Sequence, residues 1–99
     1  MEIKKEQNGD ALKLTLIGRL DAVTAADLDK VVQNELTGVK DLTMDFQELV
    51  YVASAGLRVL LMAQKKMNKQ GVMTIIHVSD EVKDVFDMTG FLDFLNIED

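Results

Sequence analysis

The chain has 99 residues, of which 47% are hydrophobic and 28% charged, a composition typical of one globular domain and not of a disordered chain. Its formal net charge of −6 disfavours nucleic acid as a partner, because a phosphate backbone would repel it. With one histidine, no cysteine, no apolar run of about 20 residues and a polar beginning, we expect no metal site, no disulfide, no membrane span and no signal peptide, and the cytoplasm is the default location.

Two antiparallel strands are predicted to open the fold. The ranges 3–6 and 11–17 flank an Asn-Gly-Asp turn at 8–10, and leucine occupies every second position from Leu12 to Leu16. Such alternation is typical of a half-buried strand that follows a hairpin turn. The chain is then expected to leave the sheet at 18–21.

A first helix is predicted to follow the second strand. Thr24, with Asp27 three residues later, resembles a capping box at the start of a helix. Gly38 is expected to end the helix in a left-handed conformation. The apolar side of this helix is expected to consist of Leu28, Val31, Val32 and Leu36.

A third strand is predicted over 39–46, with a short connection through Val50 and Tyr51 after it. Ser54 stands where this extended run ends and an amphipathic helix begins. A serine at that place is typical of a helix N-cap, whose oxygen accepts a free backbone N–H of the first turn. The same place favours a phosphate, because free amide hydrogens and the positive end of the helix dipole stabilise an anion. Ser54 is therefore the candidate switch residue, and a plain N-cap is the alternative.

The helix after Ser54 is predicted to have two different faces and to end at Gly71. One face is mostly apolar and should meet the sheet; it consists of Leu57, Leu60, Leu61, Gln64, Met67 and Asn68. The second face is basic, in a helix that contains no acid, and it consists of Arg58, Met62, Lys65 and Lys69. The three cations alone could belong to an ordinary solvent-exposed face. The flexible thioether of Met62 among them instead indicates an interaction surface suited to an acidic partner.

The C-terminal third is predicted to contain a strand, a helix and a short tail. A buried strand is expected over 72–78. Ser79 should cap a short helix over 80–89, and Gly90 should end it. The tail 91–97 is either a last short strand or irregular. The order β-β-α-β-α-β-α, with that optional last strand, predicts an α/β fold in which helices cover a small mixed β-sheet.

The motifs of ordinary catalysis are missing. Alanines flank Ser54 where a serine hydrolase elbow would place glycines, and no phosphate-binding loop is present. His77 is expected to be a hydrogen-bonded strand residue near a sheet end. Two carboxylates, Asp21 after the second strand and Asp45 near the end of the third, are expected to meet Ser54 at one edge of the sheet. There they would make the surface sensitive to phosphorylation, although polarity in loops and caps would also explain them.

Three further motifs carry a resemblance to a known family. They are GRLD at 18–21, LTMDF at 42–46 followed by YVASAGLR at 51–58, and VFDMTGF at 85–91. In this order and spacing they resemble the STAS domain family in its stand-alone bacterial form, the anti-sigma factor antagonist. The resemblance covers nearly the whole chain, so 1–99 is expected to form a single STAS domain. It implies a sheet with helices packed chiefly on one side, in agreement with the element order.

The resemblance also implies a function. In this family an anti-sigma factor that doubles as a serine kinase phosphorylates the serine that matches Ser54. The unphosphorylated antagonist binds the kinase and frees the sigma factor, phosphorylation breaks the complex, and a serine phosphatase resets it; no enzyme activity or cofactor is implied. The chain departs from the family at Ala53, where many members have Asp or a hydroxyl residue, and at Ala55, where a second hydroxyl is frequent. The partner-binding residues expected on this basis are Asp21, Asp45, Ala53, Ala55, Gly56, Arg58, Met62 and Lys65.

Two other functions compete with this one. The first is an adaptor or scaffold subunit of a signalling or lipid-transport complex that ignores phosphorylation, which Ala53 and Ala55 favour. The second is an enzyme that uses Asp21 or Asp45 with Ser54, although the sequence offers no base beyond those carboxylates. A partner that binds regardless of charge at Ser54 would indicate the adaptor, and turnover by the isolated chain would indicate the enzyme.

Overall fold

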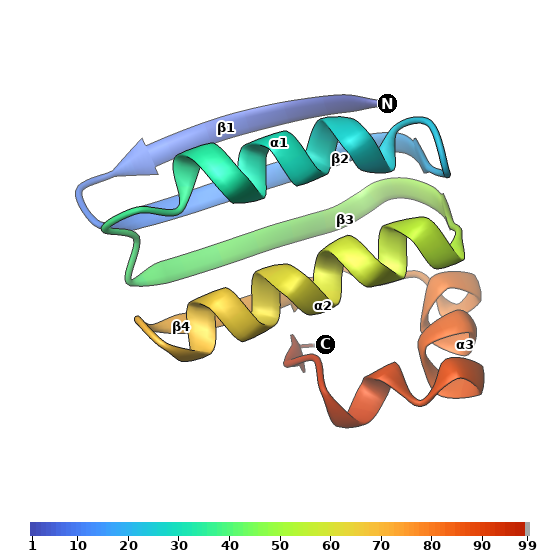
Figure 1. Cartoon of the computed structure of the whole chain (residues 1–99). Helices are drawn as coiled ribbons and strands as arrows, with labels where there is room; N and C mark the ends of the chain where they lie inside the picture. Colours follow the sequence, from blue (N-terminus) through green and yellow to red (C-terminus); the bar gives the residue numbers. More distant parts are fainter. Residues whose placement is uncertain (99) are drawn as a thin grey trace.

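The computed structural model describes residues 1–98 and contains one five-stranded sheet with the strands in the order β1-β2-β3-β4-β5 (Figure 1). β1 is antiparallel to β2, and the remaining neighbours are parallel. The predicted element order is confirmed, and the tail does form a last short strand. The strands are β1 (Glu2–Asn8), β2 (Ala11–Leu20), β3 (Asp41–Val52), β4 (Val72–Ile76) and β5 (Ile97–Glu98); the helices are α1 (Ala25–Glu35), α2 (Ser54–Asn68), α3 (Asp80–Thr89) and the 3-10 turn η1 (Phe91–Asp93).

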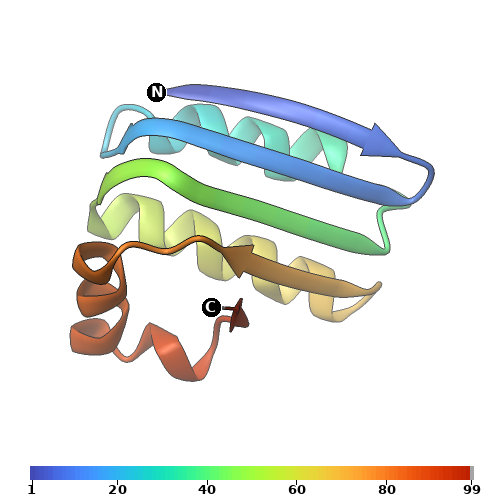
Figure 2. The same cartoon turned by 180° about the vertical axis from the view of Figure 1, so that it is seen from behind.

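The helices lie chiefly on one side of the sheet, as the family resemblance implied. α1 and α2 run along one face, and α3 stands beyond the end of β4 (Figure 1). The reverse view shows the opposite face of the sheet without a helix over it (Figure 2). We call this uncovered side the open face. It contains the strand residues that point away from α1 and α2.

The core lies between the sheet and the helices. Alternate residues of β2 are buried, and Leu14 and Leu16 are fully inaccessible to solvent. Phe46 of β3 meets Phe86 of α3 with ring centroids 6.4 Å apart, so α3 is fastened to the end of the sheet by an aromatic contact. β4 alternates in burial because only one of its faces is covered. The predicted continuous buried strand over 72–78 is therefore wrong in both length and pattern.

β3 is longer than predicted. It continues through Val52, so Val50 and Tyr51 belong to the strand and not to a connection. Nine residues of β2 pair with nine residues of β3, with register shifts between Thr15 and Ile17 and between Gly18 and Arg19. Such bulges insert extra residues into one strand and bend it. They break the alternation of apolar side chains, which is why the sequence pattern ended early.

The connections differ from prediction at α1 and agree at α3. Thr24 makes no capping hydrogen bond, and its hydroxyl instead donates to the Arg19 carbonyl at 2.7 Å, so the predicted capping box is wrong. α1 ends before Gly38, with Leu36 as its right-handed C-cap, so Gly38 is not the C-cap, although it is left-handed with φ 81° as predicted. At α3, the Ser79 hydroxyl accepts from the Val82 N–H, and Gly90 is left-handed with φ 77°, so both predictions are confirmed.

The covered face of α2 also differs slightly from prediction. Leu57, Leu60, Gln64 and Met67 are buried, whereas Leu61 is half-buried and Asn68 is exposed. Val59 and Ala63 are buried in their place because α1 packs beside α2 and widens the covered face. Gly71, the predicted terminator, follows the helix in a position where a Cβ would overlap the Lys40 carbonyl oxygen. Because the backbone at Gly71 lies so close to the residue before β3, no residue larger than glycine fits at this position without movement.

Candidate functional site

The site begins at the edge where β2 and β3 end. Leu20 and Val52 are the last paired residues of the two strands, and the Ala53 N–H donates to the Leu20 carbonyl at 2.8 Å. Asp21 and Ala53 therefore leave the sheet side by side. As predicted, the fold brings Asp21 to the edge from which Ser54 starts α2.

Ser54 is the first residue of α2, and it is not the N-cap. Ala53 occupies the N-cap position with extended backbone, and its carbonyl accepts the Leu57 N–H at 3.0 Å. The Ser54 side chain is exposed and forms no hydrogen bond within residues 1–98. The first turn contains no acid, and the first N–H groups of a helix have no partner within it. The predicted N-cap role is wrong, and the hydroxyl is left free.

Gly56 sets how closely α2 approaches the end of β2. It is buried, and a Cβ at this position would lie 2.6 Å from Leu20 Cγ, too close for any larger residue without movement. Ala55, between Ser54 and Gly56, is half-buried. The small residues Ala55 and Gly56 thus let the first turn of α2 press against the sheet edge, which leaves Ser54 on the outside.

Asp21 organises the loop between β2 and α1. Its carboxylate accepts the backbone N–H groups of Val23 at 3.0 Å and Thr24 at 2.9 Å. The hydrogen bond from the Thr24 backbone holds the pKa of Asp21 below its ordinary value of 3.8, despite a smaller opposing effect of desolvation. Asp21 therefore stands ionised beside the start of α2.

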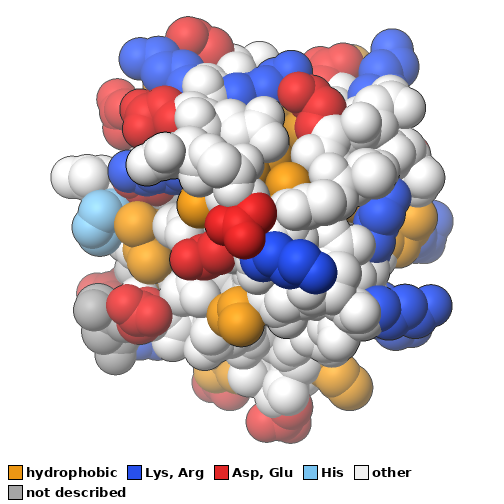
Figure 3. All heavy atoms as spheres, turned by 90° about the vertical axis from the view of Figure 1, so that its left-hand side faces the viewer, with side chains coloured by type: hydrophobic (Ala, Val, Ile, Leu, Met, Phe, Trp, Pro, Cys, Tyr) orange, Lys and Arg blue, Asp and Glu red, His pale blue; other side chains and the backbone are white. Residues whose placement is uncertain are grey.

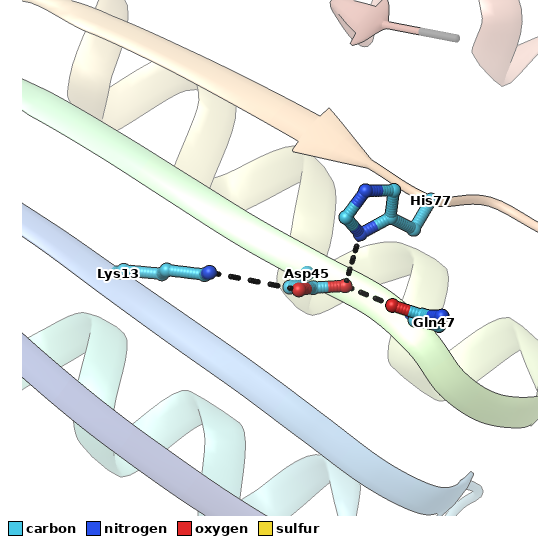
Figure 4. A network of polar contacts seen from close by, with 4 residues as sticks. All are labelled: Lys13, Asp45, Gln47 and His77. Carbon is cyan, nitrogen blue, oxygen red and sulfur yellow. Dashed lines mark hydrogen bonds and ion pairs between the residues drawn. The ribbon is translucent and has the colours of Figure 1, made fainter.

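Asp45 does not lie at this edge. It lies within β3, which continues for seven more residues to Val52, and its side chain is on the open face (Figure 4). There it accepts hydrogen bonds from the Gln47 N–H at 3.0 Å and pairs with His77 Nδ1 at 2.9 Å, with Lys13 Nζ at 3.7 Å (Figure 4). The expected position near the end of the third strand is wrong, because that strand is longer than its alternation indicated.

The surroundings of Asp45 keep it ionised although it is only 8% exposed. Desolvation alone would raise its pKa, but the Gln47 N–H, His77 and the charge of Lys13 together lower the pKa below its ordinary value of 3.8. His77 follows the end of β4 with φ 58°, so it is not inside the strand. Its predicted role as a hydrogen-bonded residue at a sheet end is confirmed.

The second face of α2 is exposed as predicted. Arg58, Lys65 and Lys69 are exposed, Met62 is 40% exposed, and the three cations form no ion pair within residues 1–98. We call these four residues the α2 stripe. Lys66 points elsewhere and donates to the Val32 carbonyl at 3.2 Å. Seen from the β1–β2 turn, Lys and Arg side chains stand on the side where the helices lie, at the right of Figure 3.

The comparison with known proteins decides the family. The model of the STAS domain matches residues 2–99. The chain belongs to the STAS domain family. A relative from Bordetella bronchiseptica with the provisional name anti-sigma factor antagonist BtrV is 35% identical over 75 residues, which are 75% of this STAS domain chain and 59% of that protein. The anti-sigma-B factor antagonist of Listeria monocytogenes is 30% identical over 98 residues, covering 95% of this chain and 84% of that one.

Solved structures agree on the fold of this STAS domain. The unphosphorylated form of the anti-sigma factor antagonist SpoIIAA superposes with a TM-score of 0.72 at 16% identity, over 99% of this chain and 88% of that one. The phosphorylated form of the same Bacillus protein superposes with a TM-score of 0.68, also at 16% identity. The STAS-like sheet and helix arrangement is thereby confirmed.

Sequence reasoning missed several exposed apolar residues of the STAS domain near Ser54. Val23 in the β2–α1 loop is 80% exposed, and Val50 on the bulged end of β3 is 62% exposed. The Arg19 guanidinium lies 4.2 Å from the centre of the Tyr51 ring, on the neighbouring strand. The available signal was the pair Val50 and Tyr51 in the predicted connection, since both residue types are enriched in strands.

Residues 1–98 contain no cluster of three or more potential metal ligands, and none of their helices is long and apolar enough to cross a membrane. An open hollow of about 330 Å³ lies beside the β1–β2 turn, with Lys13, Asp41 and Thr43 in its lining. It is at the opposite end of β3 from Ser54, so it does not extend the site.

Proposed function

We propose that this STAS domain is an anti-sigma factor antagonist whose binding to an anti-sigma factor is switched by phosphorylation of Ser54. The observation that carries the proposal is the free, exposed hydroxyl of Ser54 on the first residue of α2. The names of the two curated relatives point to the same function. In this proposal the partner is also a serine kinase, a serine phosphatase reverses the modification, and the switch controls sigma-factor-dependent transcription in the cytoplasm.

The surface around Ser54 supports a protein partner. Asp21 stands beside it, and Val23 and Val50 expose apolar side chains from the loop and strand of the same edge. The α2 stripe begins one turn along the helix with Arg58. These exposed apolar side chains and unpaired cations suit a protein partner. Such a partner would cover the apolar side chains and pair its acidic residues with the cations. Asp45 and the α2 stripe remain proposed contacts, with Asp45 the weakest because it faces another side.

Phosphorylation would change this surface by charge. The kinase transfers the γ-phosphoryl group of ATP to Ser54 Oγ, the hydroxyl proton is released, and a group with nearly two negative charges replaces a neutral one. It would stand beside the ionised Asp21. A partner with acids opposite the α2 stripe would then meet repulsion at the edge of its contact. In this role the STAS domain is a substrate and ligand and not an enzyme.

The test uses four baits in the native host: wild type, Ser54→Ala, Ser54→Asp and Ser79→Asp. Ser79 caps α3, and Asp is an equally good N-cap, so the last bait adds the same charge at another helix start without loss of the cap. We expect wild type, Ser54→Ala and Ser79→Asp to recover one kinase-like protein and Ser54→Asp to lose it. Phosphopeptide mapping of the wild-type bait should find phosphate on Ser54.

The adaptor function is the second candidate, and Ala53 and Ala55 are the observation that favours it. Both replace polar residues that many family members have beside the acceptor serine. Equal recovery of one partner by all four baits, with no phosphate on Ser54, would establish the adaptor and overturn the switch.

A further inference from the structure

We propose that Arg58 binds the phosphate of phosphorylated Ser54, so that the modification removes the nearest cation from the partner surface as well as adding charge. The inference rests on the proposed function, because it requires a phosphate on Ser54. Ser54 and Arg58 are both exposed residues of α2, four positions apart. Side chains at that spacing are neighbours on one face of a helix, with Cβ atoms about 5–6 Å apart.

Arg58 is available for this role. Within residues 1–98 it has no ion pair and no hydrogen-bond partner, and α2 contains no acid that could compete for it. A long guanidinium side chain on an exposed helix position can turn back toward the preceding turn at little cost. The side chain can therefore reach a new anion without breaking an existing contact.

The other cations near the site are less suitable. Arg19 already stacks on Tyr51 at 4.2 Å, on the strand side of the edge. Lys66 donates to the Val32 carbonyl. Lys65 is exposed and free, but it lies eleven residues beyond Ser54, about 16 Å along the helix axis. Among the described residues, Arg58 is the unpaired cation placed one turn from the acceptor.

The chemistry of the pair is favourable. A phosphoserine offers three acceptor oxygens, and a guanidinium presents two parallel N–H donors that match two of them. The orientation also fits the helix, because an anion at the first residue and a cation one turn later both agree with the direction of the dipole. The free N–H groups of the first turn add donors to the same phosphate.

The consequence is a switch with two effects from one modification. Before phosphorylation, Arg58 points a free charge at the surface where the partner is proposed to bind. Afterwards the Arg58 guanidinium is paired with the phosphate, and only Met62, Lys65 and Lys69 of the α2 stripe remain available to the partner. A partner acid that met Arg58 would then lose its counterion and face a neighbouring anion.

The test is a ³¹P NMR titration of the full chain with phosphoserine incorporated at position 54 during translation. It compares wild type with Arg58→Gln, Arg58→Lys and the matched control Lys65→Gln. A guanidinium beside the phosphate favours the dianion, so the wild-type midpoint should lie about 0.15–0.4 pH unit below that of Arg58→Gln. Arg58→Lys should fall between them, and Lys65→Gln should match wild type.

Coinciding midpoints for wild type and Arg58→Gln would overturn the inference, and so would an equal shift in Lys65→Gln, which would indicate only the general charge of the surface. All three variants change exposed residues, and their circular dichroism spectra should coincide with that of the wild type. The result does not depend on a kinase or a partner. Absence of Ser54 phosphate in the host would instead count against the proposed function, so the two failures are separable.

Discussion

His77 and Asp45 join the end of β4 to the middle of β3 across the open face, with Nδ1 of the imidazole 2.9 Å from Oδ1 of the carboxylate. The contact spans 32 positions in sequence and ties down the connection that leads into α3. It is also the point at which a histidine adopts a left-handed backbone, with φ 58°. The pair is part of the fold and not of the Ser54 edge.

Removal of this imidazole should destabilise the chain. We expect His77→Ala to lower the free energy of unfolding by about 1–2 kcal/mol, because the buried Asp45 carboxylate loses a hydrogen bond. His77→Gly should cost less than His77→Ala, since glycine accepts the left-handed backbone that costs alanine about 1 kcal/mol. Urea denaturation of the two variants measures both effects. If His77→Ala is as stable as wild type, the contact contributes nothing.

The Asp45 cluster should also give the stability a defined pH dependence. Because the pKa of Asp45 is lower in the folded chain than its ordinary value of 3.8, the ionised carboxylate stabilises the fold above that pH. This contribution is lost as the pH falls from the unfolded value through the folded one. Unfolding free energies of Asp45→Asn should therefore fall less between pH 5 and pH 3, as an approximate working range, than those of wild type. Parallel curves for the two proteins would contradict the assignment.

Gly56→Ala should destabilise the start of α2. In an ordinary helix this change stabilises by up to about 1 kcal/mol, because alanine has the higher helix propensity. Here the new Cβ would lie 2.6 Å from Leu20 Cγ, so we expect a net loss of about 1–3 kcal/mol from overpacking. Thermal unfolding gives the sign directly. A higher melting temperature would show that the helix start has room to spare.

Ser54→Asp should have nearly the same stability as wild type. The first turn of α2 has no acid, and a carboxylate there interacts favourably with the helix dipole by about 0.3–1 kcal/mol, less the repulsion from Asp21. We expect the variant to unfold within about 0.5 kcal/mol of wild type, with any gain reduced by salt. This measurement makes the binding test interpretable. A strongly destabilised Ser54→Asp would mean that lost binding reflects lost structure.

Charge reversal on the α2 stripe should weaken partner recovery more than the same change elsewhere. Arg58→Glu and Lys65→Glu each replace an unpaired cation with an anion, which should repel the proposed acidic partner. We expect each change to reduce the affinity for that partner at least about tenfold at low salt. Lys4→Glu on the exposed β1 is the matched control. Surface plasmon resonance at two salt concentrations would compare them once a partner is in hand. Equal losses in all three variants would remove the stripe from the interface.

Much of the fold could be predicted because local signals agreed with tertiary structure. The alternating leucines at 12–16 located β2, and Ser79 and Gly90 bounded α3 by capping chemistry that depends on nearby residues alone. The change from an extended apolar run to helical spacing placed Ser54 at the start of α2, although its predicted N-cap role is wrong. The STAS resemblance added the side on which the helices pack.

The errors came from features that local pattern does not contain. The bulges of β3 depend on its pairing with β2, so the true length of the strand and the place of Asp45 were hidden. Thr24 looked like a cap, but Asp21 takes the loop N–H groups and the hydroxyl turns to the Arg19 carbonyl. Ala53 leaves no side-chain cap for α2, and only the structure shows that Ser54 lies one residue inside the helix.

The way in which the residues around Ser54 are built into the core restricts how the proposed kinase could modify it. Val52 and Leu57, on either side of Ser54, are buried, and the Ala53 N–H is bonded to the neighbouring strand. A kinase that draws its substrate into a groove as an extended peptide would have to unfold this edge first. An enzyme that modifies Ser54 must therefore recognise the folded domain. A short peptide with the sequence of residues 48–60 would lack the surface that such an enzyme recognises.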